Sequence, residues 1–242
     1  MATKRLLPLT RFTQPLRRPY HSYTHPAPPG PFNEIERSIL SSAAKHIPSH
    51  GFTSTSLALG CSDAGYIAAS TNLFPKAAFS LVEWHLLAQR EALKGEVDAI
   101  AGDGAKPMGV GAKVKELTWR RLMGNEEVIH RWQEALALLA SHPSTSIHEL
   151  ALLSDEIWFL SGDVSVDTSW YTKRASLSTI YAATELFMTT DKSVGFQETR
   201  EFMERRFEDG RSIGSTLGSV GQWVGFTAHA GLNVLRSKGV RI

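Results

Sequence analysis

The chain has 242 residues, of which 42% are hydrophobic and 21% are charged, an ordinary composition for a soluble globular protein with one good-sized core or two small ones. Its single cysteine, Cys61, excludes an internal disulfide and suits a reducing compartment. With 26 Lys and Arg against 24 Asp and Glu, the net charge is +2, and this total indicates no class of partner. The distribution of charge along the chain is more informative.

All of the basic excess lies in residues 1–31, which contain five cations and no acid. The remaining residues therefore have 21 cations against 24 acids, a net charge of about −3. Acid-free segments with Arg, Ser and Thr are typical of mitochondrial transit peptides, and no continuous apolar run indicates a secretory signal. We expect a transit peptide cleaved between Arg18 and Thr24, then a stiff Pro-rich spacer at 26–31. A basic disordered tail that contacts RNA or membrane is the alternative.

Apolar residues after position 31 recur with helical spacing, and no run alternates like a strand, so the sequence predicts an all-α protein. Residues 32–92 are expected to form a helix-turn-helix unit and the start of a long helix, because short, short and long helices follow one another there. Pro75 separates the last short helix from the long one. The expected helices cover 33–49, 54–64 and 67–73 and then start again near residue 77.

Residues 93–209 are predicted to form a helical bundle. A Gly-rich stretch at 102–111 interrupts the helical pattern and is expected to be a mobile loop. The helices expected after it cover 112–123, 126–141, 147–160, 169–190 and 196–209.

The segment 163–188 joins a charged aromatic turn to a helix with almost no charge. Lys173 and Arg174 lie near the expected helix start, where the positive end of the macrodipole disfavours cations. Together with Trp170 and Tyr171 they have the composition of a protein interaction anchor. In the alternative, Trp170 continues an apolar line along the same helix into the core. Glu185, the lone acid at 175–190, is left without an assigned role.

The closing segment, 210–242, has no charged residue between Arg211 and Arg236. A helix there would be amphipathic, with Trp223 beside its apolar stripe, which is typical of a helix lying in the membrane interface. A core helix and a membrane-spanning helix are the alternatives. The residues expected to contact membrane lipid are Ile213, Leu217, Val220, Trp223, Val224 and Leu235.

Patterns for catalysis and metal binding are weak. Residues 210–214 match the nucleophile elbow around Ser212, but that chemistry needs a strand before the serine, and the preceding residues are helical and charged. His46 and His50 are separated by Pro48, and Glu127 with His130 gives only one of the motifs that a di-iron bundle needs. We therefore expect neither an enzyme nor a metal site.

Residues 63–87 resemble the second half of a TetR-type DNA-binding domain through Leu73, Phe74 and Lys76. A recognition helix must bring cations to the DNA phosphates, however, and residues 62–75 contain no Lys or Arg. We expect no nucleic-acid binding, and a TetR-like transcriptional regulator remains the alternative function.

From about Ile35 to its end, the chain resembles the lipid-binding accessory proteins of mitochondrial ubiquinone (coenzyme Q) biosynthesis, a family with a TetR-like fold. The most specific matches lie at 155–158, 162–163, 167, 170–172, 174, 180–181 and 184–186. Further matches lie at 39–40, 43–44, 48, 50–52, 74 and 76. The Gly-rich loop and the short C-terminus depart from the family pattern, which leaves loop geometry and dimerisation open.

The resemblance implies a non-enzymatic role, without a cofactor, at the matrix side of the inner mitochondrial membrane. A protein of this family would bind an isoprenoid quinone intermediate or another lipid and present it to the di-iron demethoxyubiquinone hydroxylase. The other implied partners are membrane lipids, the wider biosynthetic complex and a second copy of the chain. The implied partner surface consists of Ile157, Trp170, Tyr171 and Arg174.

Overall fold

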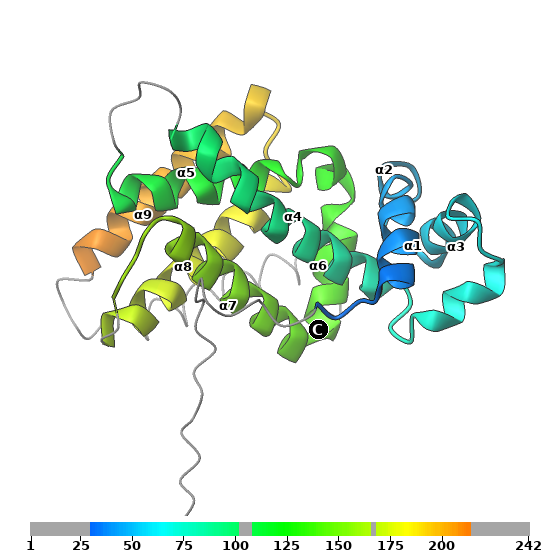
Figure 1. The fold of residues 1–242 in the computed structure, drawn as a ribbon. Coiled ribbons are helices and arrows are strands. Elements are labelled where there is room, and N and C mark those ends of the chain that lie inside the picture. Colours follow the sequence, from blue (N-terminus) through cyan, green and yellow to red (C-terminus); the bar gives the residue numbers. More distant parts are fainter. Residues whose placement is uncertain (1–29, 102–107, 166–167, 214–242) are drawn as a thin grey trace, which may run out of the picture.

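The computed structural model describes residues 30–101, 108–165 and 168–213, and every regular element in these ranges is a helix (Figure 1). The predicted all-α fold is confirmed. The helices bury two hydrophobic cores, one around the N-terminal helices and one in the bundle that follows. The predicted mobile loop at 102–111 lies mostly outside the described residues, since only 108–111 are described.

The first predicted helix, 33–49, is two helices in the structure. Helix α1 spans Glu34–Ala44 and starts with a capping box, in which Asn33 Oδ1 accepts from the Glu36 amide at 2.9 Å and the Asn33 amide donates to Glu36 at 2.8 Å. Helix α2 spans Ile47–His50, with Pro48 in its first turn. Proline lacks the N–H that a continuous helix needs, so the chain ends one helix and begins another.

Helix α3 spans Ser54–Asp63, close to its prediction, and packs closely on α1. The helices approach at Gly60, where a Cβ would lie 2.5 Å from the Cα of Ala43. The next predicted helix is a 3-10 helix, η1, at Ala68–Leu73, none of whose residues is buried. With no apolar face in the core, the segment lacks the packing that stabilises a short α-helix.

Helix α4, Ala78–Ala101, connects the two cores (Figure 1). Near its start Phe79, Leu81 and Val82 pack in the N-terminal core, and Leu93 packs in the bundle core. The N-terminal core also contains Trp132 of α6, which spans Trp132–Ser141 and was assigned to the bundle from the sequence. The two cores therefore share α4, and α6 of the predicted bundle 93–209 also packs in the N-terminal core.

The bundle core is formed by α4 together with α5 (Val110–Met123), α7 (Pro143–Leu160), α8 (Thr168–Met188) and α9 (Gln197–Ile213). The largest differences from the predicted boundaries lie at three places. The expected helix 126–141 begins as a 3-10 helix, η2, at Glu126–Arg131, α7 starts four residues before position 147, and α9 continues past position 209. Before α9 a short 3-10 turn, η3, covers Val194–Phe196.

The turn between α8 and α9 is held by Asp191, whose carboxylate accepts from the Ser193 amide at 2.7 Å and from the Thr199 amide at 2.8 Å. Burial raises the pKa of this carboxyl, but the hydrogen bonds from Thr199 and Ser193 lower it by more. The net pKa of Asp191 is therefore below its usual value.

Within the described ranges, no helix has the length and apolar character required to cross a bilayer.

Candidate functional site

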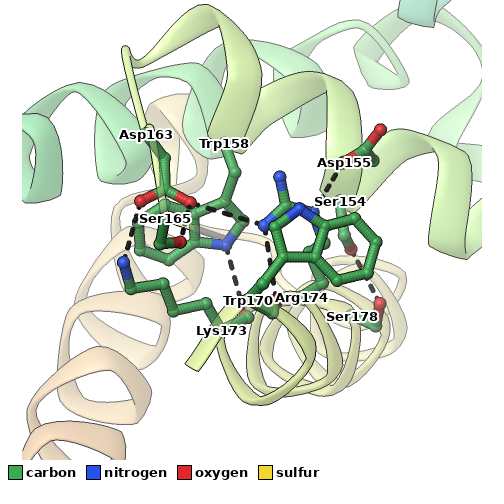
Figure 2. A network of polar contacts seen from close by, with 9 residues as sticks. All are labelled: Ser154, Asp155, Trp158, Asp163, Ser165, Trp170, Lys173, Arg174 and Ser178. Atoms are coloured by element: carbon green, nitrogen blue, oxygen red, sulfur yellow. Dashed lines mark hydrogen bonds and ion pairs between the residues drawn. The ribbon is translucent and has the colours of Figure 1, made fainter. Parts of the chain in front are cut away.

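Arg174 is the centre of a polar cluster where the start of α8 packs on α7 (Figure 2). Its Nε lies 2.5 Å from Asp155 Oδ1, and its Nη1 lies 3.4 Å from Asp163 Oδ2. The guanidinium also lies 4.0 Å from the centroid of the Trp170 ring, within the range of a cation–π contact. Only 9% of Arg174 is exposed, so these contacts fix the arginine in place.

Asp163 connects this arginine to a second cation. Lys173 Nζ donates to Asp163 Oδ1 at 2.8 Å, and Ser165 Oγ donates to Oδ2 at 2.7 Å. Burial raises the pKa of Asp163, but the hydrogen bonds from Lys173 and Ser165 and the charge of Lys173 outweigh it and lower the pKa. Trp158 completes the cluster, because its indole Nε1 donates to the Lys173 carbonyl at 3.2 Å. Two carboxylates thus balance the two cations that the macrodipole disfavours.

Three of the four predicted partner-binding residues come together in the structure. Trp170 is half-buried, and Tyr171 is 54% exposed, with its ring centroid 4.8 Å from that of Trp170 in an edge-on arrangement. Ile157 is different: it is 1% exposed and packs in the bundle core. Trp170, Tyr171 and Arg174 therefore form one group, which we call the Trp170 surface, and Ile157 is not exposed there.

A largely apolar cavity of about 280 Å³ adjoins the Trp170 surface. It lies between α5, α7, α8 and α9, and it shares Trp158 and Lys173 with the polar cluster. We call it the α9 cavity, since α9 contributes Phe207 and Gly210 to its lining. The other apolar side chains of its lining are Val114, Leu177 and Ile180.

A second cavity, of about 200 Å³, lies between α4, α6, α7 and α8, with Arg121 of α5 also in its lining. It has no lining residue in common with the α9 cavity. We call it the Arg121 cavity. Its apolar lining residues include Leu86, Leu136, Leu139, Leu150 and Leu153.

A buried polar network extends from the Arg121 cavity toward the N-terminal core. Asn125 connects it: its Oδ1 accepts from Arg121 Nη1 and from His85 Nε2, both at 2.9 Å, and its Nδ2 donates to Glu185 at 2.9 Å. The Tyr181 hydroxyl donates to the same Glu185 oxygen at 2.8 Å. The sequence missed this network. Its one signal was Glu185, since a lone acid in an apolar helix needs buried partners.

Burial determines the protonation of the network. Burial, and then the positive charge of Arg121, lowers the pKa of His85 to about 4, so the imidazole is neutral near pH 7. Burial raises the pKa of Glu185, while Arg121 and the hydrogen bonds from Tyr181 and Asn125 act in the opposite direction. Burial also raises the pKa of the Tyr181 phenol well above its usual value.

The predicted membrane-binding residues are almost all beyond the described part of the chain. Ile213 is the last residue of α9, and its side chain is not described. The predicted residues outside the described ranges are Leu217, Val220, Trp223, Val224 and Leu235.

The described part of the structure does not support the catalytic and metal-binding patterns noted in the sequence. Ser212 lies within α9, so a helix and not a strand precedes it, which rules out the nucleophile elbow. Among the described residues, no three His, Cys, Asp or Glu side chains are grouped so that they could hold a metal ion. His46 instead lies 2.7 Å from Asp63, between α1 and α3.

Sequence comparison shows which known proteins this chain resembles. The COQ9 family model matches residues 143–214, which include α7, α8 and the whole Trp170 surface. The mitochondrial ubiquinone biosynthesis protein coq9 of Schizosaccharomyces pombe is 34% identical over 227 residues, 93% of this chain and 88% of its own length.

Two animal relatives match less of their own length. The mitochondrial COQ9 protein of Drosophila melanogaster is 34% identical over 180 residues, 72% of this chain and 55% of its own length. The human COQ9 protein is 29% identical over 194 residues, which make up 77% of this chain and 61% of the human protein. On these matches, this chain belongs to the COQ9 family of ubiquinone biosynthesis proteins.

Proposed function

We propose that this protein is a non-enzymatic accessory factor of ubiquinone biosynthesis. It binds an isoprenoid quinone intermediate or another lipid and presents it to the demethoxyubiquinone hydroxylase. It works without a cofactor, as a peripheral protein on the matrix side of the inner mitochondrial membrane. The relatives' names, which give ubiquinone biosynthesis and mitochondria, support the pathway and the compartment.

One observation carries the proposal: the α9 cavity shares Trp158 and Lys173 with the polar cluster around Arg174, and so it lies next to the Trp170 surface. An apolar ligand in that cavity would lie beside the surface on which a partner enzyme docks. Trp, Tyr and Arg are enriched among the residues that anchor protein interfaces, which supports docking at this place.

Membrane attachment by the closing segment, 210–242, completes the proposal. A quinone intermediate has an isoprenoid tail that partitions into the bilayer, so a protein that hands it to a matrix enzyme must reach the lipid surface. The wider biosynthetic complex and a second copy of this chain are further proposed partners, whereas nucleic acid is not one.

Lipid extraction from the purified full chain, followed by mass spectrometry, tests ligand binding. We expect an isoprenoid quinone intermediate or a phospholipid to co-purify. Protein that yields neither, even after expression with the ubiquinone pathway active, would contradict the lipid-presenting role.

Calorimetric titration with the purified hydroxylase tests the partner. Tyr171→Ala should weaken binding by about 1–2 kcal/mol if Tyr171 anchors the interface. Tyr66→Ala is the matched control, because Tyr66 is also an exposed tyrosine but follows α3, in the N-terminal unit. Equal affinity of both variants and the unaltered protein would contradict docking at the Trp170 surface.

A further inference from the structure

A groove lined by leucines opens at the corner between α6 and α7. It is the mouth of the Arg121 cavity, and two of the lining residues, Ile147 and Ala182, are exposed there. Ile147 is 68% exposed, although Leu139 and Leu150 of the same lining are half-buried. We call this opening the α6–α7 groove. Contiguous exposed apolar surface, unlike a single exposed side chain, generally marks a place where another apolar surface binds.

The chain around the groove has few charges. Residues 135–148, which include the largely exposed start of α7, contain no Lys, Arg, Asp or Glu. Of the charged residues that line the groove, Arg90 and Glu149 lie 3.4 Å apart as an ion pair, and Arg121 and Glu185 belong to the buried network. The groove therefore fits an occupant without charge, which leaves these pairings intact.

The closing segment of this chain has the matching composition. It has no charged residue between Arg211 and Arg236, and a helix there would carry one apolar stripe. Away from a membrane, water would have to cover that stripe, which favours its burial against another apolar surface. The segment proposed to bind the bilayer is therefore suited to an apolar groove as well.

The end of α9 lies close enough for the closing segment to reach the groove. Gly210, in the last turn of α9, packs on α8, because a Cβ there would lie 3.6 Å from Ser176 Oγ. Ala182, at the groove, is six residues further along α8, which is about 9 Å along the helix axis. A helix of residues 214–235 would be about 33 Å long, so it is longer than the distance it has to cover.

The face of α8 between these two points carries no charge. Ala175, Thr179 and Ala182 follow one another on this face with helical spacing, and each is exposed or half-buried. Arg174, before them, is held inward by the polar cluster, and Glu185, after them, is buried. An apolar helix can therefore lie along this face without burying an unpaired charge.

We propose that the closing segment, residues 214–242, docks in the α6–α7 groove when no membrane is present and leaves the groove to bind the bilayer. The groove and the lipid surface then compete for one apolar stripe. The inference rests on the proposed membrane attachment and adds its regulation. The apparent affinity for membrane falls with the fraction of molecules whose segment is docked.

Flotation of the full chain with vesicles of phosphatidylcholine and cardiolipin tests the competition. Ile147→Asp puts a charge into the groove and should release the segment. This variant should bind the vesicles about threefold or more tightly than the unaltered protein, because more molecules have a free segment. Ile67→Asp is the matched control: Ile67 is 75% exposed, lies just before η1, and gains the same charge on substitution. Vesicle binding by Ile147→Asp that is no tighter than that of Ile67→Asp would overturn the proposal.

Failure of this inference differs from failure of the proposed function. If the unaltered protein and both variants float equally, membrane attachment stands and the groove does not compete with it. If neither the unaltered protein nor Ile147→Asp floats, membrane attachment itself is contradicted, and the inference with it.

Nuclear magnetic resonance of the full chain without vesicles locates the segment. A nitroxide on Gln222→Cys, on the polar side of the expected helix, should broaden the methyl resonance of Ile147 and leave that of Ile67 sharp. Cys61 is buried, so the label is directed to position 222. A sharp Ile147 signal would overturn the proposal. Equal broadening in a mixture of separately nitroxide-labelled and methyl-labelled chains would also overturn it, since the groove would then hold the segment of a second copy.

Discussion

Single residues show most clearly where inference from the sequence ends. The sequence showed that the helix at 175–190 has almost no charge and that Glu185 is the lone acid in it. Its hydrogen-bond partner Asn125 lies 60 residues earlier in the chain. A pairing over that separation depends on how α5 and α8 pack, which local residue patterns do not determine.

The same network predicts a dependence of stability on pH. The pKa of His85 is about 4 in the folded protein and about 6.5 when unfolded, so the unfolded state binds more protons between these values. The contribution of neutral His85 to the free energy of unfolding is fully present above about pH 6.5. It is lost as the pH falls toward 4, by about 3 kcal/mol. Urea unfolding of His85→Gln should show a smaller loss over this window.

His148→Gln is the control for this experiment, because His148 is exposed. It should lose stability with falling pH as the unaltered protein does. A His85→Gln variant with the same pH profile as the unaltered protein would mean that the imidazole is not held neutral by burial.

Arg174 and Tyr171 are predicted to differ in what they contribute. The side chains of Arg174 and Asp155 are 10% and 16% exposed, so Arg174→Ala breaks a buried ion pair and should destabilise the fold by about 3 kcal/mol. Tyr171→Ala should change stability by less than about 0.5 kcal/mol. Chemical denaturation of both variants measures this. Equal destabilisation would show that Tyr171 also belongs to the packed structure.

At the scale of elements, the type of most helices was predictable and their ends were not. Pro48 divides the first expected helix, whereas Pro143 begins α7 four residues earlier than the apolar pattern indicated. Proline is compatible with a first helical turn and incompatible with a helix interior, and the sequence alone does not say which position it occupies. The 3-10 geometry of η1 was also missed, because it follows from the lack of a packing partner.

Substitution of glycine by alanine is predicted to have opposite effects at Gly60, in the contact between α1 and α3, and at Gly95, outside it. Gly60→Ala should destabilise the protein by about 2 kcal/mol or more, because the new Cβ would overlap Ala43 on α1. Gly95→Ala, at an exposed position of α4 with no atom within 4 Å of the new Cβ, should stabilise it by about 0.5–1 kcal/mol. Thermal unfolding of both variants tests the pair, and a stable Gly60→Ala protein would contradict the close packing of the helices.

For the whole molecule, the all-α class and the family followed from the sequence, and the assignment of each helix to a core did not. The sequence predicted that the long helix, α4, extends through both units, but it did not indicate that α6 packs against the N-terminal helices through Trp132. Which core a helix joins depends on packing between distant segments, and the helical period of the sequence is the same in both cases. The two cavities were equally inaccessible to prediction, because inward positions of a bundle look alike in the sequence.

Membrane attachment is a prediction about the whole molecule. Removing residues 214–242, which leaves α9 complete, should abolish flotation of the protein with liposomes. Trp223→Asp in the full chain should weaken flotation, and Val194→Asp should not, since Val194 is fully exposed in the described part of the chain but lies outside the closing segment. Unchanged flotation of the truncated protein would place the membrane contact elsewhere.

The passage of α4 through both cores also determines how the molecule opens. Neither core can unfold by itself without exposing part of α4, because Phe79 and Leu93 of this one helix are buried in different cores. Amide hydrogens between these residues should therefore exchange with solvent only when the whole protein unfolds, and those of η1, with no buried residue, should exchange early. The helix that separates the two cores in space makes them a single cooperative unit.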